Sequence, residues 1–416
     1  MVQTLDGVRT HLKKILYISY DGMTDPLGQS QVIPYLKELV KDGYRVTLLS
    51  VEKKDRLEKN GQQIRSLLEA SGIKWETLIF TTQPPLLSKL IDQRKLNRKA
   101  KQLHRENNFD MVHCRSYVAA EAGSKLAKTT GIPFLFDMRG FWVDERVDSG
   151  LWNLKNPLFK FFYTIYKKKE KRYFAASSHI ISLTEKGKQE LMNTYKVPAA
   201  KITVIPCCAD LAHFDYRRLS SGEMENIKKR SDIPAGARVL SYLGSLGGWY
   251  MTGEMLEFFK ILQQKIPSAI FLIITHDNKE QLLQKVEAKG IDKEVVRVIP
   301  AGRNEVPGLL SVSDWNIFFI KDAYSKKASS PTKQGEVMAM GIPVICNDIG
   351  DTGKIVEESA AGILVKSFQQ KELEAACHRL LNFQPNKAAI REAAFKYYDL
   401  ARGAALYKKI YEDLLN

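Results

Sequence analysis

The 416-residue chain has little of what marks secreted, membrane-spanning or zinc-binding proteins. It holds only five cysteines, two of them adjacent as Cys207 and Cys208, and it shows no paired spacing of metal ligands. A disulfide framework or zinc site is therefore not expected. No apolar run approaches the ~20 residues that a membrane-spanning helix needs. Met1 to Thr10 lack the apolar core of a signal peptide, so the expected location is the cytoplasm.

Two further absences narrow the function. No G-x-G-x-x-G follows the first strand of either half, which disfavours an NAD-linked dehydrogenase. No nucleic-acid recognition motif is present, although a net charge of +16 and a pI near 9.4 would suit a nucleic-acid-binding protein. The charge is uneven, because residues 1–207 hold 35 of the 63 Lys and Arg but 21 of the 47 Asp and Glu, a net +14. We therefore expect the first half to face an anionic partner other than nucleic acid.

Two basic segments of helical spacing lie in that half, Arg94–Lys101 and Lys160–Tyr173. The second segment also mixes aromatic residues among its lysines. Such a helix either lies on an anionic bilayer, where each cation contributes ~1 kcal/mol, or is solvated with its aromatic rings packed into the core. We favour contact with an anionic membrane surface, and hence a peripheral position on the inner face of the cell membrane.

Short apolar segments typical of buried strands alternate with helical patterns in two series. The first series opens with Lys14–Ser19, a helix expected from about Gln29 to Lys41, and Arg45–Ser50. The second opens near Val239–Gly244. Because strand–helix–strand units build parallel sheets, two such series predict two doubly wound α/β domains.

Three other segments complete this organisation. Tyr216–Gly236 is mostly polar and charged, which favours a linker between the domains. Phe395–Leu415 has helical apolar spacing and no strand after it. Asp144–Asp148 carries several carboxylates, which in a loop are usually solvated.

The segment from Ser330 to Gly341 is the most informative in the chain. Ser330 and Pro331 favour a helix start with a hydroxyl cap, and Gly341 ends the helix before an apolar strand. A helix N-terminus offers free N–H groups and partial positive charge to a phosphate. Lys333 lies in the first turn, where a cation is unfavourable without an anion, and Glu336 follows on nearly the same face. The alternative is a surface turn with an ion pair between these two side chains; the pattern favours a nucleotide-sugar site.

Polar residues after the strands of the first series are further candidate site residues, because ligands bind beyond the carboxyl ends of parallel strands. Asp137 and Arg139 either act on a ligand hydroxyl and a phosphate or form a buried pair that only stabilises a loop. His113 follows a strand but is more often structural in such a position, whereas Arg115 is a better phosphate ligand. Asp21 either touches the ligand or starts a turn.

Four segments in order resemble the family-four, GT-B-type glycosyltransferases: Asp21–Gln29, Val204–Asp210, Leu243–Leu246 and Ser330–Val344. The resemblance covers nearly the whole chain. It implies an α/β GT-B fold, that is, two facing Rossmann-like doubly wound domains with a deep interdomain cleft. It further implies an acceptor-side domain over residues 1–215, a nucleotide-sugar-binding domain over 216–394, and a C-terminal helix over 395–416 that returns to the first domain.

The resemblance also assigns residues to the donor. The expected donor-binding residues are Gly28, Gly244, Arg303, Ser330, Thr332, Lys333 and Glu336. Glu336 matches the glutamate that binds the donor ribose in relatives, but the other glutamate of the family falls on Ala328. The family's Arg and Lys after the first strand of the second domain are replaced by Ser245–Met251, and its catalytic histidine is missing near Asp137. Gly28 either allows close approach of the diphosphate or is an ordinary turn glycine.

The expected function is retaining transfer of a hexosyl group from a nucleoside diphosphate sugar to a glycan or lipid-linked acceptor. The setting would be synthesis of a cell-surface polysaccharide, lipopolysaccharide or lipid-linked oligosaccharide, usually without a metal ion or other cofactor. One alternative is a sugar-nucleotide epimerase or phosphorylase on the same fold. The alternative of another class is a basic nucleic-acid-binding protein.

Overall fold

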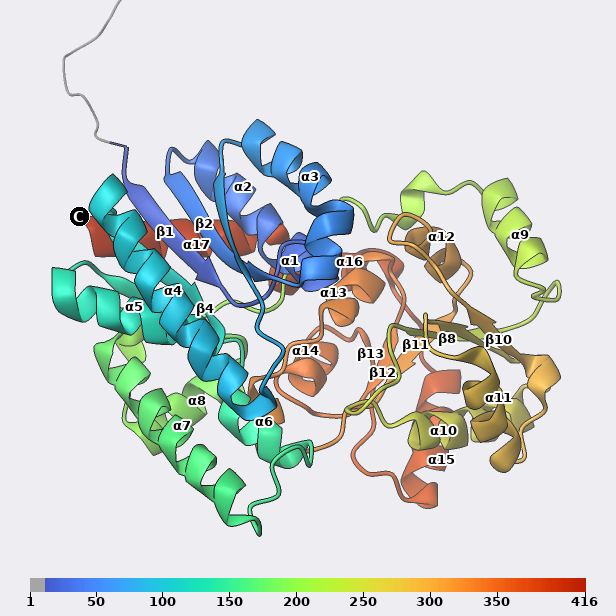
Figure 1. Ribbon diagram of the computed structural model, residues 1–416. Helices are drawn as coiled ribbons and strands as arrows, with labels where there is room; N and C mark the ends of the chain where they lie inside the picture. The colour runs from blue at the N-terminus through green and yellow to red at the C-terminus, as the bar shows by residue number, and fades with distance from the viewer. Residues whose placement is uncertain (1–11) are drawn as a thin grey trace, which may run out of the picture.

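The computed structural model describes residues 12–416 and contains two parallel sheets, one in each half of the chain (Figure 1). The strand orders are β3-β2-β1-β4-β5-β6-β7 and β10-β9-β8-β11-β12-β13. In both sheets the first strand of the series is central and the order reverses beside it, as in doubly wound Rossmann-like folds. The predicted pair of Rossmann-like domains is confirmed. Met1 to Thr10, which were expected to lack a signal peptide, lie outside the described residues.

All neighbouring strands pair in parallel. The first sheet consists of β1 (Lys14–Ser19), β2 (Arg45–Glu52), β3 (Lys74–Ile79), β4 (Met111–Arg115), β5 (Phe134–Asp137), β6 (His179–Ser182) and β7 (Ile202–Val204). The second consists of β8 (Val239–Leu243), β9 (Ile270–Ile274), β10 (Val296–Ile299), β11 (Trp315–Phe318), β12 (Val344–Cys346) and β13 (Gly362–Leu364).

Helices connect these strands. Those of the first half are α1 (Pro26–Gln31), α2 (Ile33–Lys41), α3 (Lys54–Ala70), α4 (Pro85–Asn107), α5 (Ser116–Thr130), α6 (Trp142–Asp148), α7 (Pro157–Ala176) and α8 (Glu185–Tyr195). Those of the second half are α9 (Ser221–Arg230), α10 (Thr252–Lys265), α11 (Lys279–Ala288), α12 (Val306–Ser311), α13 (Thr332–Ala339), α14 (Thr352–Glu358), α15 (Gln370–Leu381), α16 (Lys387–Tyr398) and α17 (Leu400–Leu415). Short 3-10 helices are η1 (Ala199–Lys201), η2 (Tyr216–Arg218), η3 (Lys293–Val295) and η4 (Tyr324–Ala328).

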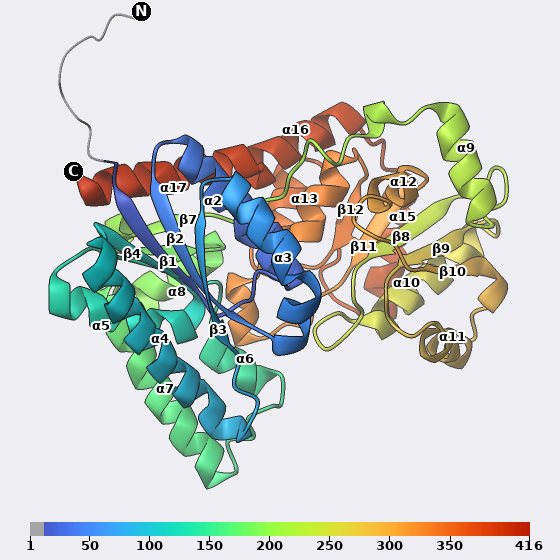
Figure 2. The same ribbon diagram turned by 45° about the horizontal axis from the view of Figure 1, so that its top comes forward.

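Strand β1 shows why the first sheet is covered on both faces. Its side chains alternate, so Leu16 and Ile18 enter a core shared with α4, α5 and α7, whereas Ile15 and Tyr17 enter a core shared with α2, α3 and α17. Figure 2 shows α17 lying along the first sheet, far from the second-half strands that precede it in sequence. The apolar runs that predicted buried strands therefore supply two cores at once.

The chain passes between the domains at two adjacent points. The backbone N–H of Ala209 donates to the carbonyl of Tyr398 (2.9 Å), and the N–H of Leu400 donates to the carbonyl of Ala209 (3.2 Å). Asp399 breaks the expected terminal helix into α16 and α17 and caps α17 by accepting from the N–H of Arg402. Ala209 and Phe214 already pack in the core of the second sheet. The boundaries expected at 215/216 and 394/395 stay predictions, and these contacts lie a few residues from both.

Several local expectations were wrong. The segment 29–41, expected as one helix, is two helices separated at Val32; the regular part begins later than Gln29, as expected from Pro34, which lies in the first turn of α2. The Tyr216–Gly236 linker contains α9, which Ser220 and Glu223 begin with a capping box. Asp144–Asp148 is not a solvated loop but part of α6, where Asp144 is buried. Strands β3 and β13, each of which lies at one edge of its own sheet, were not predicted.

Candidate functional site

The segment before α13 joins the two domains at the carboxyl ends of their strands. The hydroxyl of Ser330 accepts from the N–H of Cys207 (3.2 Å), just beyond β7. The hydroxyl of Thr184, just beyond β6, donates to the carbonyl of Lys327 (2.6 Å). A cavity of about 290 Å³ lies beside this junction, but neither Lys333 nor Glu336 lines it. Ser330 lines this cavity, but its other walls come largely from α14, α16 and α17.

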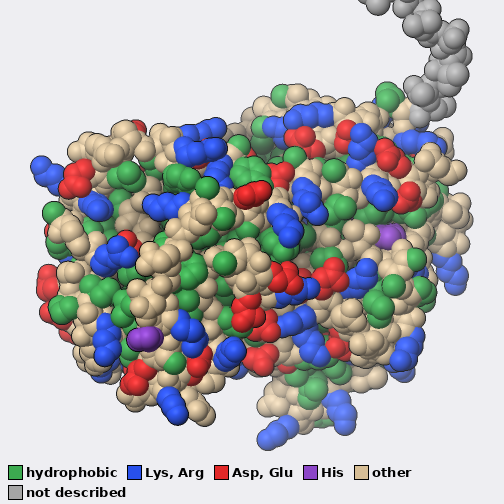
Figure 3. Space-filling view, turned by 180° about the vertical axis from the view of Figure 1, so that it is seen from behind, with side chains coloured by type: hydrophobic (Ala, Val, Ile, Leu, Met, Phe, Trp, Pro, Cys, Tyr) green, Lys and Arg blue, Asp and Glu red, His purple; other side chains and the backbone are tan. Residues whose placement is uncertain are grey.

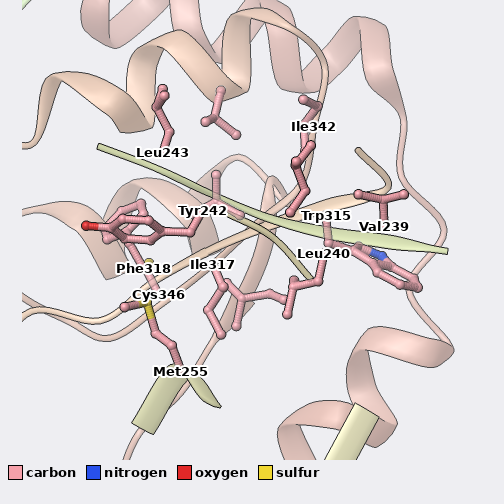
Figure 4. Packing of buried hydrophobic residues seen from close by; sticks show 14 of the residues in the cluster. Val239, Leu240, Tyr242, Leu243, Met255, Trp315, Ile317, Phe318, Ile342 and Cys346 are labelled. Atoms are coloured by element: carbon pink, nitrogen blue, oxygen red, sulfur yellow. The ribbon is translucent and has the colours of Figure 1, made fainter. Parts of the chain in front are cut away.

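The amine of Lys333 lies between two tyrosine rings. Its Nζ is 4.2 Å from the ring centroid of Tyr242 and 3.7 Å from that of Tyr250, and it donates to the Tyr242 hydroxyl (3.0 Å). Tyr242 is anchored in the β8 core, with its hydroxyl at the edge of the cluster shown in Figure 4. Burial lowers the pKa of Lys333 to about 7, against the opposing charges of Glu336 and Asp277. Because Lys333 forms no ion pair within residues 12–416, this cation is unneutralised.

The loop after β8 covers this amine. Gly244 has φ +107°, and a Cβ there would lie 3.1 Å from the Nζ of Lys333. Only glycine suits both that conformation and that approach. Asp277, just beyond β9, holds the loop by accepting from the Ser245 hydroxyl (3.0 Å) and from the N–H of Leu246 (2.5 Å). The structure thus brings together Gly244 and Lys333, which the sequence assigned to the same ligand.

Glu336, on α13, pairs with an arginine from the loop before α12. Its Oε1 lies 3.2 Å from a guanidinium nitrogen of Arg303, although the two residues are 33 positions apart. Burial raises the pKa of Glu336, and the charge of Arg303 works against that rise. The surface ion pair between Lys333 and Glu336, the alternative reading of the segment, is not formed. Arg303 is half exposed, so one side of the pair is open to solvent.

The start of α13 differs from the expectation. Thr332 is its first helical residue, Pro331 takes the cap position, and no side chain caps the helix. Ser330 was expected to cap it, which was wrong, because its hydroxyl is used by the N–H of Cys207. The first N–H groups of α13 are therefore left without a side-chain acceptor, which is the arrangement that suits an anion.

A glycine is required at position 28 for a steric reason that does not involve a ligand. A Cβ on this α1 residue would lie 2.2 Å from the carbonyl oxygen of Gly22. The turn between them is held by Glu52, a fully buried carboxylate at the end of β2. Glu52 accepts from the N–H of Met23 (2.7 Å) and from the N–H and hydroxyl of Thr24 (3.1 and 2.6 Å). Donor contact by Gly28 stays a prediction.

The acceptor-side candidates form a buried ion cluster. Arg115 lies 3.2 Å from Asp21 and 3.6 Å from Asp137, and Arg139 lies 3.7 Å from Asp137. Tyr407 of α17 donates its hydroxyl to Asp137 (3.0 Å). Asp137 is only 1% exposed, which favours the stabilising pair over a catalytic base in this conformation. Asp21 is the exposed member of the cluster, with about a third of its side chain accessible (34%).

His113 packs inside the first domain. Its Nδ1 is 2.8 Å from the hydroxyl of Tyr411, and its ring contacts Tyr17 and Tyr407. Burial lowers its pKa to about 4, so the ring is neutral near pH 7. This environment agrees with the structural role that a lone histidine usually has.

Known proteins show the same organisation. Residues 30–213 match the family Glycosyltransferase Family 4, and residues 223–397 match Glycosyl transferases group 1. The chain belongs to the family-four-type glycosyltransferases. The D-inositol 3-phosphate glycosyltransferase of Nocardiopsis dassonvillei is 20% identical over 305 residues, 71% of this chain and 68% of that protein.

Solved structures share the GT-B fold of this glycosyltransferase. Anabaena Alr3699/HepE in complex with UDP and glucose has a TM-score of 0.69 at 14% identity, covering 96% of this chain and 100% of that one. WaaG, a glycosyltransferase involved in lipopolysaccharide biosynthesis, has a TM-score of 0.64 at 14% identity, covering 94% and 98%. At such identities the likeness establishes the fold, and the chemistry has to come from this chain's own residues.

This glycosyltransferase differs from its family at η4. Ala328, at the position of the family's first glutamate, packs in the core of the first domain and lies against Gly187. The preceding residues of η4 contact the first domain as well: Lys326 Nζ lies 2.8 Å from Glu145, and the N–H of Ser325 donates to Asp148 (2.9 Å). Ala328 is only 1% exposed, so a longer side chain at this position would have to displace its neighbours.

Other features of the glycosyltransferase bear on cofactors and membranes. Within residues 12–416 no group of three or more His, Cys, Asp and Glu side chains is placed to hold a metal ion. No helix in that range is long and apolar enough to cross a membrane. Most aromatic rings of the basic segment in α7 pack into the first domain, as Tyr166 and Tyr173 do, but Phe161 is 60% exposed.

Proposed function

We propose that this glycosyltransferase moves a hexosyl group from a nucleoside diphosphate sugar to an acceptor hydroxyl, with retention of anomeric configuration. The observation that carries the proposal is the buried, unneutralised amine of Lys333 beside the uncapped start of α13. A diphosphate at this point would supply the missing negative charge and accept from the free N–H groups. The family's missing Arg and Lys pair makes Lys333 the principal cation of the site.

Glu336 and Arg303 complete the donor site in this proposal. The carboxylate of Glu336 accepts from the ribose hydroxyls, while Arg303 holds it in place and adds positive charge near the nucleotide. Thr332, at the first helical position, lies where its hydroxyl and N–H can donate to a phosphate oxygen. Gly244 lets the backbone of the loop after β8 approach the amine of Lys333 closely, beside the proposed diphosphate position.

The chemistry follows from charge. As the bond between the sugar and the diphosphate breaks, negative charge grows on the leaving phosphate oxygens, and fixed positive charge at Lys333 and α13 lowers the energy of that state. The closed contact between η4 and the first domain keeps water from the reacting centre. We propose that the acceptor hydroxyl attacks from the side of the leaving phosphate, whose oxygen takes the proton, and that no metal ion is needed.

Calorimetry tests this site. UDP-, GDP-, ADP- and TDP-sugars would be titrated into the wild type, Lys333→Ala and Glu336→Ala, with Lys371→Ala on the exposed face of α15 as a matched control. We expect at least one donor to bind the wild type and the control alike, and about tenfold or more weaker to each site variant. Unchanged affinity in both site variants would refute the assignment. Conversion of the sugar nucleotide without acceptor would instead indicate an epimerase.

We also propose that the acceptor is lipid-linked and that the end of α7 contacts the anionic inner face of the membrane, as part of cell-surface glycan synthesis. No residue of α7 before Tyr166 is buried, and three exposed apolar side chains lie at this end: Leu151 (59%), Leu158 (49%) and Phe161 (60%). From behind, the projection at the lower edge of the first domain shows apolar surface beside basic side chains (Figure 3). Exposed Lys155 and Lys160 belong to the same segment.

Vesicle sedimentation tests this surface. The protein is expected to sediment with phosphatidylglycerol-containing vesicles and not with pure phosphatidylcholine, because the lysines need anionic headgroups. Phe161→Glu should release it, since a charge replaces an inserted ring. Leu381→Glu, a similarly exposed apolar position on the second domain, is the control that should leave sedimentation unchanged. Equal sedimentation of both variants would contradict the proposal.

A further inference from the structure

The rings of Tyr242 and Tyr250 lie against the amine of Lys333. A lysine that only bound phosphate would be expected near solvent, where the ligand can reach it. Here the amine is enclosed, with only 9% of the residue exposed, and two aromatic rings lie against it. Tyr242 cannot leave, because its ring is buried in the β8 core. Tyr250, in the loop, is only partly buried and packs against that core from its edge.

The backbone around Tyr250 is hydrogen-bonded to a neighbouring segment, so any movement that uncovers Lys333 falls to the side chain. The N–H of Lys321 donates to the carbonyl of Trp249 (2.8 Å), and the N–H of Met251 donates to the carbonyl of Phe319 (2.9 Å). These bonds fix the residues on both sides of Tyr250 to the segment after β11. Within residues 12–416 its hydroxyl makes no hydrogen bond that would hold the ring. A change in the side-chain torsion of Tyr250, which breaks its packing against the core edge and the Tyr242 ring, is therefore the movement that would uncover the amine without moving the loop.

We propose that Tyr250 is a displaceable cover on the diphosphate subsite, which shields the Lys333 amine in the empty enzyme and is exchanged for phosphate oxygens when donor binds. The inference rests on the proposed donor site. In the empty state the amine is stabilised by cation–π contact and by the Tyr242 hydroxyl, which are weaker partners than an anion. Donor binding replaces the ring by the diphosphate. Tyr250 is thus a positioning residue, because it acts on the substrate through Lys333.

Replacement of the Tyr250 ring by a diphosphate should also change the protonation of the Lys333 amine. The groups that face the amine are Tyr242 from β8, Tyr250 from the loop, Glu336 from its own helix and, at longer range, Asp277 beyond β9. Glu336 is engaged by Arg303, and Asp277 by Ser245 and Leu246, so neither neutralises Lys333. With the amine's pKa near 7, a share of the empty enzyme carries a neutral Lys333 at slightly alkaline pH. A bound diphosphate favours the charged form, and the amine then takes a proton from the buffer.

Calorimetry in two buffers of different ionisation enthalpy measures that proton directly. UDP-glucose is the first probe, followed by the other sugar nucleotides, because a diphosphate diester has no group that titrates near neutrality. At pH 7.5 we expect uptake of roughly 0.5–0.9 protons per bound nucleotide, falling towards zero at pH 5.5 where the amine is already charged. Lys333→Met should abolish the uptake. Tyr250→Ala should reduce it by more than half, because a hydrated amine is charged before donor arrives, while Tyr250→Phe keeps the ring and the uptake.

The outcomes separate the two proposals. Binding without proton uptake by the wild type, or uptake that persists in Lys333→Met, overturns the inference about Tyr250 and leaves the donor site standing. Equal uptake in Tyr250→Ala and Tyr250→Phe also overturns it. Failure of every sugar nucleotide to bind overturns the proposed function, and the inference with it. The wild-type measurement depends on no variant, so a misfolded variant does not protect the inference.

Discussion

The contact between η4 and the first domain should depend on one lysine more than on its neighbour. Lys326 is buried, its Nζ lies 2.8 Å from Glu145 of α6, and it stands 3.8 Å from the ring centroid of Trp249. Lys327 is 45% exposed and pairs at 2.8 Å with Glu190 of α8. Replacing each lysine by methionine keeps length and apolar volume while removing the charge, so the two variants form a matched pair.

The expected free-energy changes depend on how far each charged side chain is exposed to solvent. Glu145 is 41% exposed, so the ion pair with Lys326 contributes only about 1 kcal/mol. The cation–π contact with Trp249 is desolvated and contributes about 1–2 kcal/mol. Trp249 belongs to the second domain, so both contacts of Lys326 are lost only when η4 itself opens. Lys326→Met should therefore favour local opening of η4 by about 2–3 kcal/mol. Lys327→Met loses a pair with the half-buried Glu190, but its own side chain is 45% exposed, so it should favour opening by less than about 1 kcal/mol.

Hydrogen exchange followed by mass spectrometry measures how readily η4 opens. The N–H of Ser325 is protected by its bond to Asp148 (2.9 Å), so its exchange reports separation of η4 from α6. A loss of 2–3 kcal/mol corresponds to exchange about 30–150 times faster in Lys326→Met, against less than about fivefold in Lys327→Met. Equal rates in the two variants, or an unchanged rate in Lys326→Met, would refute the reasoning from burial.

Three further predictions concern the first domain and the cation of the donor site. Gly28→Ala should destabilise the protein by about 2–3 kcal/mol in denaturant unfolding, because its Cβ would meet the Gly22 carbonyl at 2.2 Å, whereas Gly222→Ala, with nothing within 4 Å, should be neutral; similar values would contradict this. His113 has a folded pKa near 4, below its unfolded value of about 6.5, so the unfolded state binds the extra proton between these values and stability should fall by about 3 kcal/mol on acidification from pH 7 to 4. His113→Asn should show a correspondingly flatter profile in urea unfolding, and an identical profile would contradict the burial argument. Transfer activity, assayed by product formation, should survive EDTA, since Lys333 and Arg303 supply the positive charge; abolition restored by a divalent ion would contradict the metal-free proposal.

The regular parts of the fold were predictable because burial on two faces leaves a clear pattern. Strands such as β9, Ile270–Ile274, are wholly apolar and short, which is typical of parallel strands covered on both sides. Strand β3, Lys-Trp-Glu-Thr-Leu-Ile, was missed because it is neither wholly apolar nor strictly alternating, and β13 because a glycine opens its three residues.

The donor site was predictable in outline but not in detail. The order of Ser330, Lys333 and Glu336 pointed to α13, yet the partner of Glu336 is Arg303, which only the fold brings near. Tyr242 and Tyr250 carried no signal, because a tyrosine in an apolar strand or a glycine-rich loop resembles a packing residue. The hydroxyl of Ser330 would have suited a helix cap, and only the crossing of the chain at Cys207 gives it another donor.

In the first domain, too, contacts between residues far apart in the sequence were not predictable. Glu52 ends a strand and precedes charged residues, so nothing in the sequence connects it with the turn near Gly22, 30 positions earlier. Parallel pairing of β1 with β2 places the two ends side by side and makes Glu52 the organiser of that turn. Likewise, only the fold brings Tyr407, on a helix from the end of the chain, against Asp137 at the end of its strand.

A crystal structure with a bound sugar nucleotide is the most direct test of the central claim. The account predicts the diphosphate at the first turn of α13, with an oxygen within hydrogen-bond distance of the Lys333 amine and the ribose hydroxyls on Glu336. It also predicts the Tyr250 ring turned away from its 3.7 Å contact with the Lys333 amine. A nucleotide bound elsewhere, with Lys333 still enclosed by both rings, would contradict it.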